Sequence, residues 1–341
     1  MDFSLLYFAN REVKDPPSEY DLLIETARFA DTHGFTALWV PERHFHPFGG
    51  AYPNPALAAA ALAVSTRHIR LRAGSVVLPL HDPVSIVEDW SFVDNLSRGR
   101  VDLAIATGWL PNDFVLVPER YAERRRYGLD NISVIQDLWA GKTIKRRNGD
   151  GDEVEVLTYP RPVQPEIGLW LTASSSPETF REAGARGLNV LTALLFQRVE
   201  QLAPKIEIYR AAREANGHDP STGVVTLMVH TFVGESDDAV REVVREPFME
   251  YLTSSADLWR NHWRYKKAID QKQLVEIAFE RYFRTSAMFG SVERCTDYAR
   301  SLMAVGVDEV ASLVDFGVPA RTVLAALPHL DEVHKSCSSE G

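Results

Sequence analysis

Short, mostly apolar runs alternate with amphipathic stretches along almost the whole chain. Apolar runs bounded by turn residues predict strands, and apolar positions at helical spacing predict helices between them. The predicted strands are Phe3–Phe8, Ala37–Val40, Ile69–Val77, Val101–Ala106, Leu169–Ala173, Asn189–Thr192, Val225–Val233 and Glu309–Asp315. The predicted helices are Ser18–Thr32, Pro55–Ser65, Val84–Leu96, Arg125–Trp139, Pro177–Arg186, Val199–Asn216, Asp237–Leu252 and Val292–Val305. This alternation is typical of a parallel sheet surrounded by helices.

The residues after the first predicted strand distinguish two architectures for such a sheet. A doubly wound sheet normally has a glycine-rich phosphate loop at this point, but residues 9–17 contain no glycine. We therefore predict an α/β protein with a single (β/α)8 TIM barrel over residues 1–330 and a polar C-terminal tail over 331–341. Two insertions interrupt the repeat, namely a charged, proline-spaced surface segment at about 141–165 and a lid region at about 250–290.

Composition narrows the class of protein further. Of the 341 residues, 45% are hydrophobic and 25% are charged, which is ordinary for a globular protein. The net charge of −10 disfavours nucleic acid and anionic membranes as main partners. No apolar stretch is long enough to span a membrane, and the N-terminal residues lack a signal-peptide pattern. Cys295 and Cys337 show no metal-binding spacing, so we expect a cytoplasmic protein in a reducing compartment.

Polar and glycine residues follow three successive predicted strands. They are Glu42-Arg-His-Phe45 after the second, Gly74-Ser75 within the end of the third, and Thr107-Gly-Trp109 after the fourth. In a barrel of this type, the carboxyl ends of the strands carry the active site. Two histidines, His44 and His46, lie near Glu42 and could in principle bind a metal ion. No third ligand is suggested nearby, so no metal site is predicted.

The segment after the fifth predicted strand has the chemistry of a phosphate site. Pro177 suits the first turn of a helix, and Ser176 is a good N-cap residue. Unpaired backbone N–H groups at a helix N-terminus, next to Ser174 and Ser175, would bind an anion. An ordinary capped helix remains the alternative interpretation.

Six segments together carry a resemblance to a known family. They are Glu42–Phe45, Gly74–Pro79, Asp94–Arg100, Gly108–Phe114, Thr172–Phe180 and Gly187–Thr192. In combination they resemble the bacterial luciferase-like superfamily of flavin-dependent monooxygenases. The chain is most similar to the subfamily associated with nonribosomal-peptide and polyketide natural-product biosynthesis. The resemblance extends from Phe3 to Asp315.

The resemblance implies an FMNH2-dependent, two-component monooxygenase. A separate flavin reductase would supply FMNH2, O2 would be the co-substrate, and one oxygen atom would enter an organic substrate. That substrate would be an amino-acid, peptide or acyl intermediate, free or tethered to a carrier protein. A homodimer is also implied, with Pro55–Ser65 in its interface. A deazaflavin-dependent oxidoreductase of the same fold and a non-catalytic flavin-binding protein are the alternatives.

The resemblance also implies roles for individual residues. Gly74 and Ser75 would form a non-prolyl cis peptide under the flavin ring, with Thr107 and Trp109 beside it. The phosphate would bind Ala173, Ser174, Ser175, Ser176 and the backbone of Glu178, with Arg124 and Arg125 as cations. The luciferases have two adjacent histidines after the glutamate, and Arg43 replaces the first of them. His44 is then the candidate catalytic residue, with Arg43 orienting an anionic or carbonyl group, although His44 could instead be structural.

Overall fold

The computed structural model describes residues 1–8, 16–195, 197–260 and 271–338. Eight parallel strands form a closed barrel, because β9 pairs with β8 on one side and with β11 on the other. The barrel strands are β1 (Asp2–Leu6), β2 (Ala37–Val40), β3 (Arg70–Val77), β4 (Val101–Ala106), β7 (Gly168–Thr172), β8 (Asn189–Ala193), β9 (Val225–Gly234) and β11 (Glu309–Leu313). The predicted (β/α)8 barrel and its eight strands are therefore confirmed.

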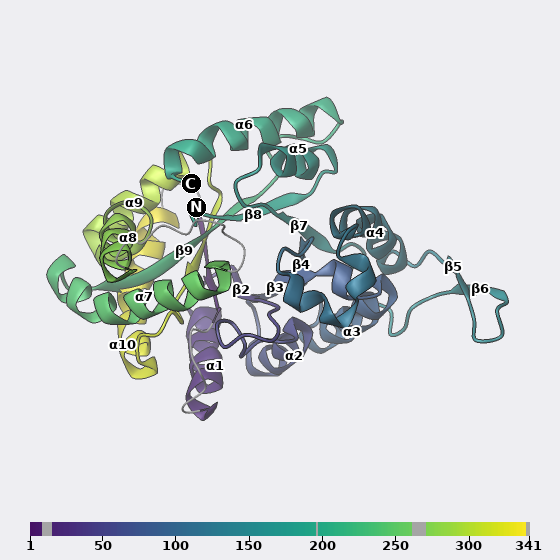
Figure 1. The fold of residues 1–341 in the computed structure, drawn as a ribbon, viewed down its shortest axis with the longest axis horizontal. Coiled ribbons are helices and arrows are strands. Elements are labelled where there is room, and N and C mark those ends of the chain that lie inside the picture. Colours follow the sequence, from purple (N-terminus) through teal and green to yellow (C-terminus); the bar gives the residue numbers. More distant parts are fainter. Residues whose placement is uncertain (9–15, 196, 261–270, 339–341) are drawn as a thin grey trace.

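Helices surround this barrel, as Figure 1 shows. They are α1 (Pro16–Thr32), α2 (Pro55–Ser65), α3 (Pro83–Ser97), α4 (Arg124–Trp139), α5 (Pro177–Ala185), α6 (Val199–Ala215), α7 (Asp237–Arg260), α8 (Gln271–Thr285), α9 (Val292–Ala304) and α10 (Ala320–Ser338). Local sequence explains several starts. Asn54 caps α2 by accepting hydrogen bonds from two backbone N–H groups, and Asp82 caps α3 by accepting one from the Val84 N–H. Each cap is followed by a proline at the first helical position.

Both predicted insertions contain regular secondary structure. The segment at 141–165 includes an antiparallel hairpin of β5 (Ile144–Arg147) and β6 (Glu153–Val156), which projects away from the barrel in Figure 1. The segment at 250–290 includes the end of α7, all of α8 and β10 (Met288–Ser291). Strand β10 pairs with the last residues of β9, beyond the part of β9 that lies in the barrel. Residues 261–270 of the predicted lid lie outside the described residues.

The predicted polar tail is wrong for residues 331–338, which form the last turns of α10. The side chain of Cys337 is fully buried, and Val333 and His334 are buried as well. His334 contacts the rings of Phe3 and Phe35, so this helix packs against the first strand and the turn after the first helix. The composition of the tail misled the prediction because exposed polar residues such as Glu332 and Lys335 alternate with the buried ones. Residues 339–341 are not among those described.

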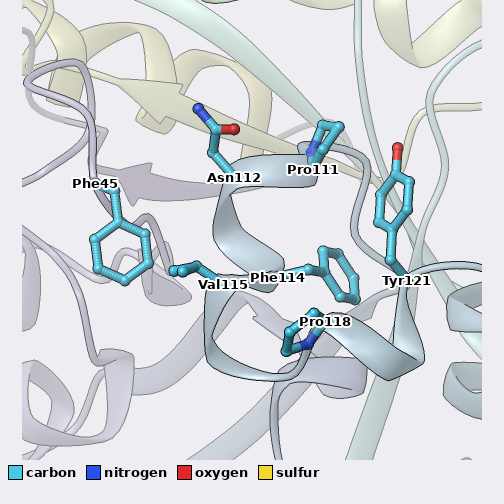
Figure 2. A pocket seen from close by; sticks show the side chains of 7 residues that line it. All are labelled: Phe45, Pro111, Asn112, Phe114, Val115, Pro118 and Tyr121. Atoms are coloured by element: carbon cyan, nitrogen blue, oxygen red, sulfur yellow. The ribbon is translucent and has the colours of Figure 1, made fainter.

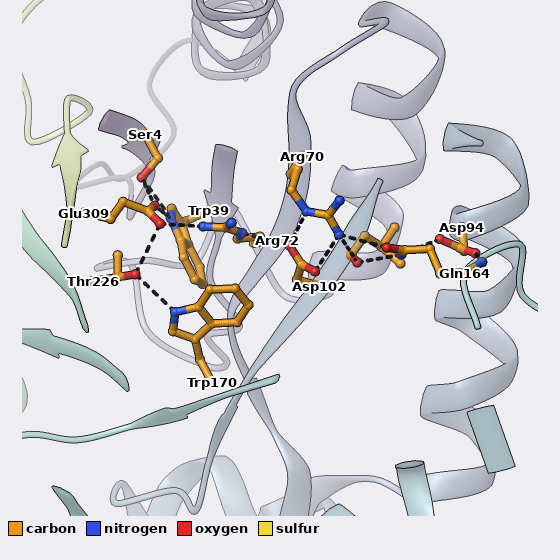
Figure 3. Close-up of polar contacts among 11 residues, drawn as sticks. Ser4, Trp39, Arg70, Arg72, Asp94, Asp102, Gln164, Trp170, Thr226 and Glu309 are labelled. Carbon is orange, nitrogen blue, oxygen red and sulfur yellow. Dashed lines mark hydrogen bonds and ion pairs between the residues drawn. The ribbon is translucent and has the colours of Figure 1, made fainter. Parts of the chain in front are cut away.

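A charged network occupies the amino-terminal half of the barrel interior (Figure 3). The buried Arg72 guanidinium donates to Asp102 Oδ2 at 2.9 Å and to Glu309 Oε2 at 2.7 Å. Arg70 adds two hydrogen bonds of 2.6 Å to the Asp102 carboxylate. Burial alone would lower the pKa of Arg72, but the two carboxylates outweigh it and raise that pKa above its ordinary value. Two arginines and two carboxylates make the network neutral, which limits the cost of burying it.

Two tryptophans fix the Arg72 side chain between them. The guanidinium carbon lies 4.4 Å from the ring centroid of Trp170 and 4.9 Å from that of Trp39. The Trp39 indole N–H lies 3.0 Å from both Ser4 Oγ and Glu309 Oε1. The network therefore ties β1, β2, β3, β4, β7 and β11 together through side chains as well as backbone hydrogen bonds.

We expect Arg72→Gln to lower the free energy of unfolding by about 3–5 kcal/mol, because it leaves the buried Glu309 carboxylate without its cation. Urea titration followed by tryptophan fluorescence would measure this loss. The matched control is Arg28→Gln, since Arg28 is exposed and pairs with its helix neighbour Glu25. That control should change stability by less than about 0.5 kcal/mol. A loss of similar size in both variants would show that the network does not hold the barrel together.

Candidate active site

The predicted flavin-contacting residues lie together at the carboxyl ends of adjacent strands. The peptide bond between Gly74 and Ser75 is cis, as the resemblance implied. The Ser75 hydroxyl is hydrogen-bonded to the Thr172 hydroxyl at the end of β7. Because β4 lies between β3 and β7, this bond links segments on either side of the strand that leads to Thr107 and Trp109. The predicted ring site and the predicted phosphate segment therefore share one rim of the barrel.

Gly74 packs directly against the tryptophan that belongs to the charged network. A Cβ atom added at Gly74 would lie 3.1 Å from Trp39 Cβ and 3.2 Å from its Cε3. Those contacts are tighter than ordinary van der Waals separations, so a side chain at Gly74 would have to displace the indole. Through Trp39, the interior network therefore fixes the position of the backbone at Gly74.

Glu42 is the most completely satisfied polar group in the site. Its Oε2 accepts from the Val77 backbone N–H at 2.7 Å, and its Oε1 lies 2.9 Å from His44 Nε2 and 2.6 Å from His81 Nε2. Burial raises the pKa of Glu42, but these three partners outweigh it and hold that pKa below its ordinary value. An ionised Glu42 can only accept, so both imidazoles donate through Nε2. His44 Nδ1 is then the nitrogen left to accept a proton.

Arg43 and Asp113 form a second, much looser charged pair at the same rim. Arg43 Nη1 lies 3.7 Å from Asp113 Oδ2, and both side chains are only 6% exposed. The Arg43 guanidinium lies 5.5 Å from the ring centroid of Trp109 and 6.0 Å from that of Phe8. Burial lowers the pKa of Arg43, with partial compensation from Asp113. Burial likewise raises the pKa of Asp113, although Arg43 and His44 oppose this.

The predicted phosphate segment is exposed and leads into α5. Ser174, Ser175 and Ser176 are all exposed, and Ser176 occupies the N-cap position without a capping bond from its own side chain. The Ser174 carbonyl accepts from Gln197 Nε2 at 3.2 Å and from the Thr192 hydroxyl at 3.4 Å. These two residues hold the segment from behind. No signal in the sequence had singled out Gln197.

The charged residues around this segment separate into two groups. Arg125 Nη1 reaches the Thr179 hydroxyl at 3.3 Å, which brings one cation to the first turn of α5. Arg124 instead donates to the carbonyls of Gly108 and Tyr121 at 3.1 and 2.8 Å, so it braces the loop after β4. The Glu178 carboxylate pairs with Arg181, which offsets the negative charge next to the segment.

An open groove of about 780 Å³ lies between Phe45 and the segment after β4. Figure 2 shows Phe45 on one side of it and residues of the short helix η2 (Pro111–Leu116) on the other. The groove is lined by Phe45, Pro111, Asn112, Phe114, Val115, Pro118 and Tyr121. This mostly apolar lining suits the carbon skeleton of an organic molecule.

Among the described residues, no three histidine, cysteine, aspartate or glutamate side chains are grouped as a metal site requires. Across the same residues, no helix combines the length and apolar character that crossing a bilayer demands.

Comparison with protein families assigns the chain. Residues 1–309 match the family described as luciferase-like monooxygenase. The chain belongs to this family. The prediction that the chain is an enzyme of the luciferase-like monooxygenase family is therefore confirmed.

Two curated relatives match most of this family member. It is 28% identical to the oxygenase component of flavin-dependent trigonelline monooxygenase from Acinetobacter baylyi, over 97% of this chain and 93% of the relative. It is 29% identical to 4-hydroxyprotoasukamycin monooxygenase from Streptomyces nodosus subsp. asukaensis, over 82% of this chain and 76% of the relative.

Solved structures show the same fold at lower identity. Monooxygenase RslO1 from Streptomyces bottropensis has a TM-score of 0.81 at 22% identity, with 97% of this chain and all of that chain covered. The oxygenating constituent of 3,6-diketocamphane monooxygenase from Pseudomonas putida, in complex with FMN, has a TM-score of 0.81 at 18% identity, with 98% of each chain covered. An F420-dependent secondary alcohol dehydrogenase has a TM-score of 0.69 at 18% identity, with 97% of this chain and 99% of that chain covered.

We expect Glu42→Gln to lower the free energy of unfolding by about 1–3 kcal/mol at pH 7, because it removes a buried, ionised acceptor. The folded-state pKa of Glu42 lies below its ordinary value, so the stabilisation is present above the unfolded-state pKa and is lost as the pH falls through the folded one. The difference between wild type and variant should therefore be constant above about pH 5 and shrink below about pH 4.

Urea titrations of both proteins from pH 7 down to about pH 3 would measure this difference. Glu25→Gln is the control, because Glu25 is exposed and pairs with the equally exposed Arg28. A difference that stays constant over the whole pH range would show that the Glu42 charge does not stabilise the site.

Proposed function

We propose that this chain is the oxygenase component of an FMNH2-dependent two-component monooxygenase. It would insert one oxygen atom from O2 into an organic substrate, namely an amino-acid, peptide or acyl intermediate of natural-product biosynthesis. The observation that carries the proposal is the single rim that joins the Gly74-Ser75 peptide to the serine segment before α5. The two curated relatives, one a flavin-dependent oxygenase component and one an asukamycin-type monooxygenase, support it.

The residues at this rim suit FMN in shape and charge. Gly74 and Ser75 offer a flat backbone surface without a large side chain, and Thr107 and Trp109 would border the ring. Backbone N–H groups from Ala173 to Glu178 and the hydroxyls of Ser174, Ser175 and Ser176 would hold the phosphate. Arg125 would supply the cation, while Arg124 would act through the loop that it braces.

Reduced FMN, when bound, would supply the activation of O2 and the transferred oxygen atom. The protein would supply binding, orientation and exclusion of water. His44 Nδ1, with its Nε2 held by Glu42, would take or return a proton at the reacting centre. Phe45 and the η2 residues would seat the apolar part of the substrate in the open groove.

The partners follow from the same proposal. FMNH2 would come from a separate flavin reductase by diffusion or transient contact, because the sequence has no glycine-rich nicotinamide loop after its first strand. A carrier protein could present the substrate as a tethered intermediate. Cys295 and Cys337 are both free thiols, which supports the proposed cytoplasmic location.

A homodimer is part of the proposal. Leu57 and Val64 on α2 are each 70% exposed, and Phe92 on the adjacent α3 is 55% exposed. Apolar side chains gathered on one outer face are typical of a protein–protein interface.

The second candidate function is deazaflavin-dependent hydride transfer. This candidate is supported by the shared fold of an F420-dependent secondary alcohol dehydrogenase. Titrating the purified protein with FMN, FMNH2 and coenzyme F420 would separate the two. We expect FMNH2 to bind most tightly and O2 uptake to start with FMNH2 and a reductase, with one added oxygen atom in the product by mass spectrometry. Binding of F420 alone, or flavin binding without substrate-dependent oxygenation, would overturn the proposal.

Ser175→Asp tests the phosphate site directly. A carboxylate at this position would repel the FMN phosphate, so we expect the dissociation constant for FMNH2 to rise at least ~10-fold. The control is Ser133→Asp, which adds the same charge to an exposed position on α4. Equal affinity in the two variants would remove the serine segment from the cofactor site.

The double variant Leu57→Glu with Val64→Glu tests the dimer face. Charges on this face should oppose its burial, so light scattering should report a dimer for wild type and a monomer for the variant at the same concentration. Val115→Glu is the control, because Val115 is also 66% exposed but lies on η2. A wild-type monomer, or a variant that stays dimeric, would contradict the assignment of this face.

A further inference from the structure

One edge of the Arg43 guanidinium lacks partners although the side chain is buried. Only 6% of the side chain is exposed, and Nη1 faces Asp113 at 3.7 Å. Neither Nε nor Nη2 has a hydrogen-bond partner among the described residues. These two nitrogens form the side edge of the planar group, which is the edge that binds a carboxylate through two parallel hydrogen bonds.

Asp113 has the complementary deficit. Its Oδ2 faces Arg43, but its Oδ1 is buried and has no partner among the described residues. In the interior network of Arg70, Arg72, Asp102 and Glu309, each charged group makes close hydrogen bonds. The Arg43–Asp113 pair differs from that network in this respect. A buried donor edge next to a buried acceptor costs free energy unless a ligand satisfies both.

The position of the pair places it within the proposed active site. Arg43 follows β2 and is adjacent to His44, while Asp113 belongs to η2, which also lines the open groove. Trp109 and Phe8 flank the guanidinium with their rings, and Gly49 leaves room for the Arg43 stem, since a Cβ there would lie 2.7 Å from Arg43 Cγ. The stem is therefore confined, and the free edge has a fixed direction.

We propose that Arg43 and Asp113 form a receptor for a zwitterionic organic acid, with the substrate carboxylate on Arg43 Nε and Nη2 and a cationic or N–H donor group on Asp113 Oδ1. The proposal rests on the function proposed above and names the chemical class of its substrate. Asp113 also explains why the ligand would be a carboxylate and not a phosphate. A second negative charge on the ligand would meet the Asp113 carboxylate beside the guanidinium.

Access imposes a further condition on this receptor. Nε, Nη2 and Oδ1 are closed to solvent in this structure. A ligand reaches them only by displacing neighbouring side chains, so binding should couple to a local rearrangement that the empty protein does not make. Such desolvated charge pairs discriminate strongly between ligands with and without the matching group.

Three probes of nearly equal size separate the two halves of the receptor. L-Phenylalanine has both the carboxylate and the ammonium group, 3-phenylpropionate lacks the ammonium group, and L-phenylalaninamide lacks the carboxylate. Calorimetric titration of the full-length, flavin-free protein would measure each dissociation constant. We expect wild type to bind L-phenylalanine at least ~30-fold more tightly than either analogue.

Two variants then assign each group. Arg43→Gln should weaken L-phenylalanine and 3-phenylpropionate at least ~30-fold and leave L-phenylalaninamide within about twofold. Asp113→Asn should weaken L-phenylalanine and L-phenylalaninamide but not 3-phenylpropionate. Arg43→Lys keeps the charge without the two-pronged edge and should fall between wild type and Arg43→Gln. Arg126→Gln is the matched control for lost charge, because Arg126 is exposed on α4.

Thermal unfolding and FMN titration of each variant distinguish the possible failures. Arg43→Gln should lower the melting temperature by much less than Arg72→Gln, because Asp113 lies 3.7 Å from Arg43 and makes no close hydrogen bond to it. An arginine with a purely structural role would lower the melting temperature as much as Arg72 does on removal. Equal weakening of all three probes by Arg43→Gln, or no binding of any probe by wild type at millimolar concentration, would overturn the receptor. Loss of FMN affinity in Arg43→Gln with unchanged probe binding would also overturn it, since the guanidinium would then serve the flavin. Failure of wild type to bind FMN would instead overturn the function proposed above and leave the probe result independent.

Discussion

The ion pair between Arg72 and the carboxylates of Asp102 and Glu309 determines how the rest of the barrel is arranged. It lies inside the closed sheet, where each charge depends on the others for its solvation. Trp39 belongs to this network through its indole N–H and also forms the surface on which Gly74 rests. The position of the rim backbone at Gly74 therefore depends on the electrostatic network beneath it, through the packing of Trp39.

The rim itself divides into a satisfied half and an unsatisfied half. Glu42 has three close hydrogen-bond partners, so it fixes the orientation of His44 and His81 before any ligand arrives. For Arg43, the next residue along the chain, the charged partner among the described residues is Asp113, at the longer distance of 3.7 Å. These neighbouring residues suggest two separate roles. Glu42 orients His44 for proton transfer before any ligand binds, and Arg43 keeps donors available for the substrate.

Much of the fold could be predicted from the sequence, because the barrel strands are apolar runs bounded by turn residues. Strand β10 was missed because Met288–Ser291 is short and pairs only with the outer end of β9, which no local pattern indicates. The tail was misjudged because burial of Cys337 depends on tertiary packing of α10. At the site, motif resemblance singled out Gly74, Ser75 and the serine segment as candidates. It could not reveal Gln197, whose amide acts from behind the segment, or the pairing of Glu178 with Arg181.

The replacement of a histidine by Arg43 is the point at which resemblance gave least guidance and the structure gives most. A purely structural arginine would resemble Arg72, whose Nε and Nη1 each donate to a carboxylate. Arg43 is equally buried but leaves its two-pronged edge unused, and burial already disfavours its charge. A fold retains such a cost only where another interaction recovers it. The free edge of Arg43 is next to His44, and the charges of the interior network are paired with one another. The missing interaction is therefore best supplied by the substrate of the enzyme.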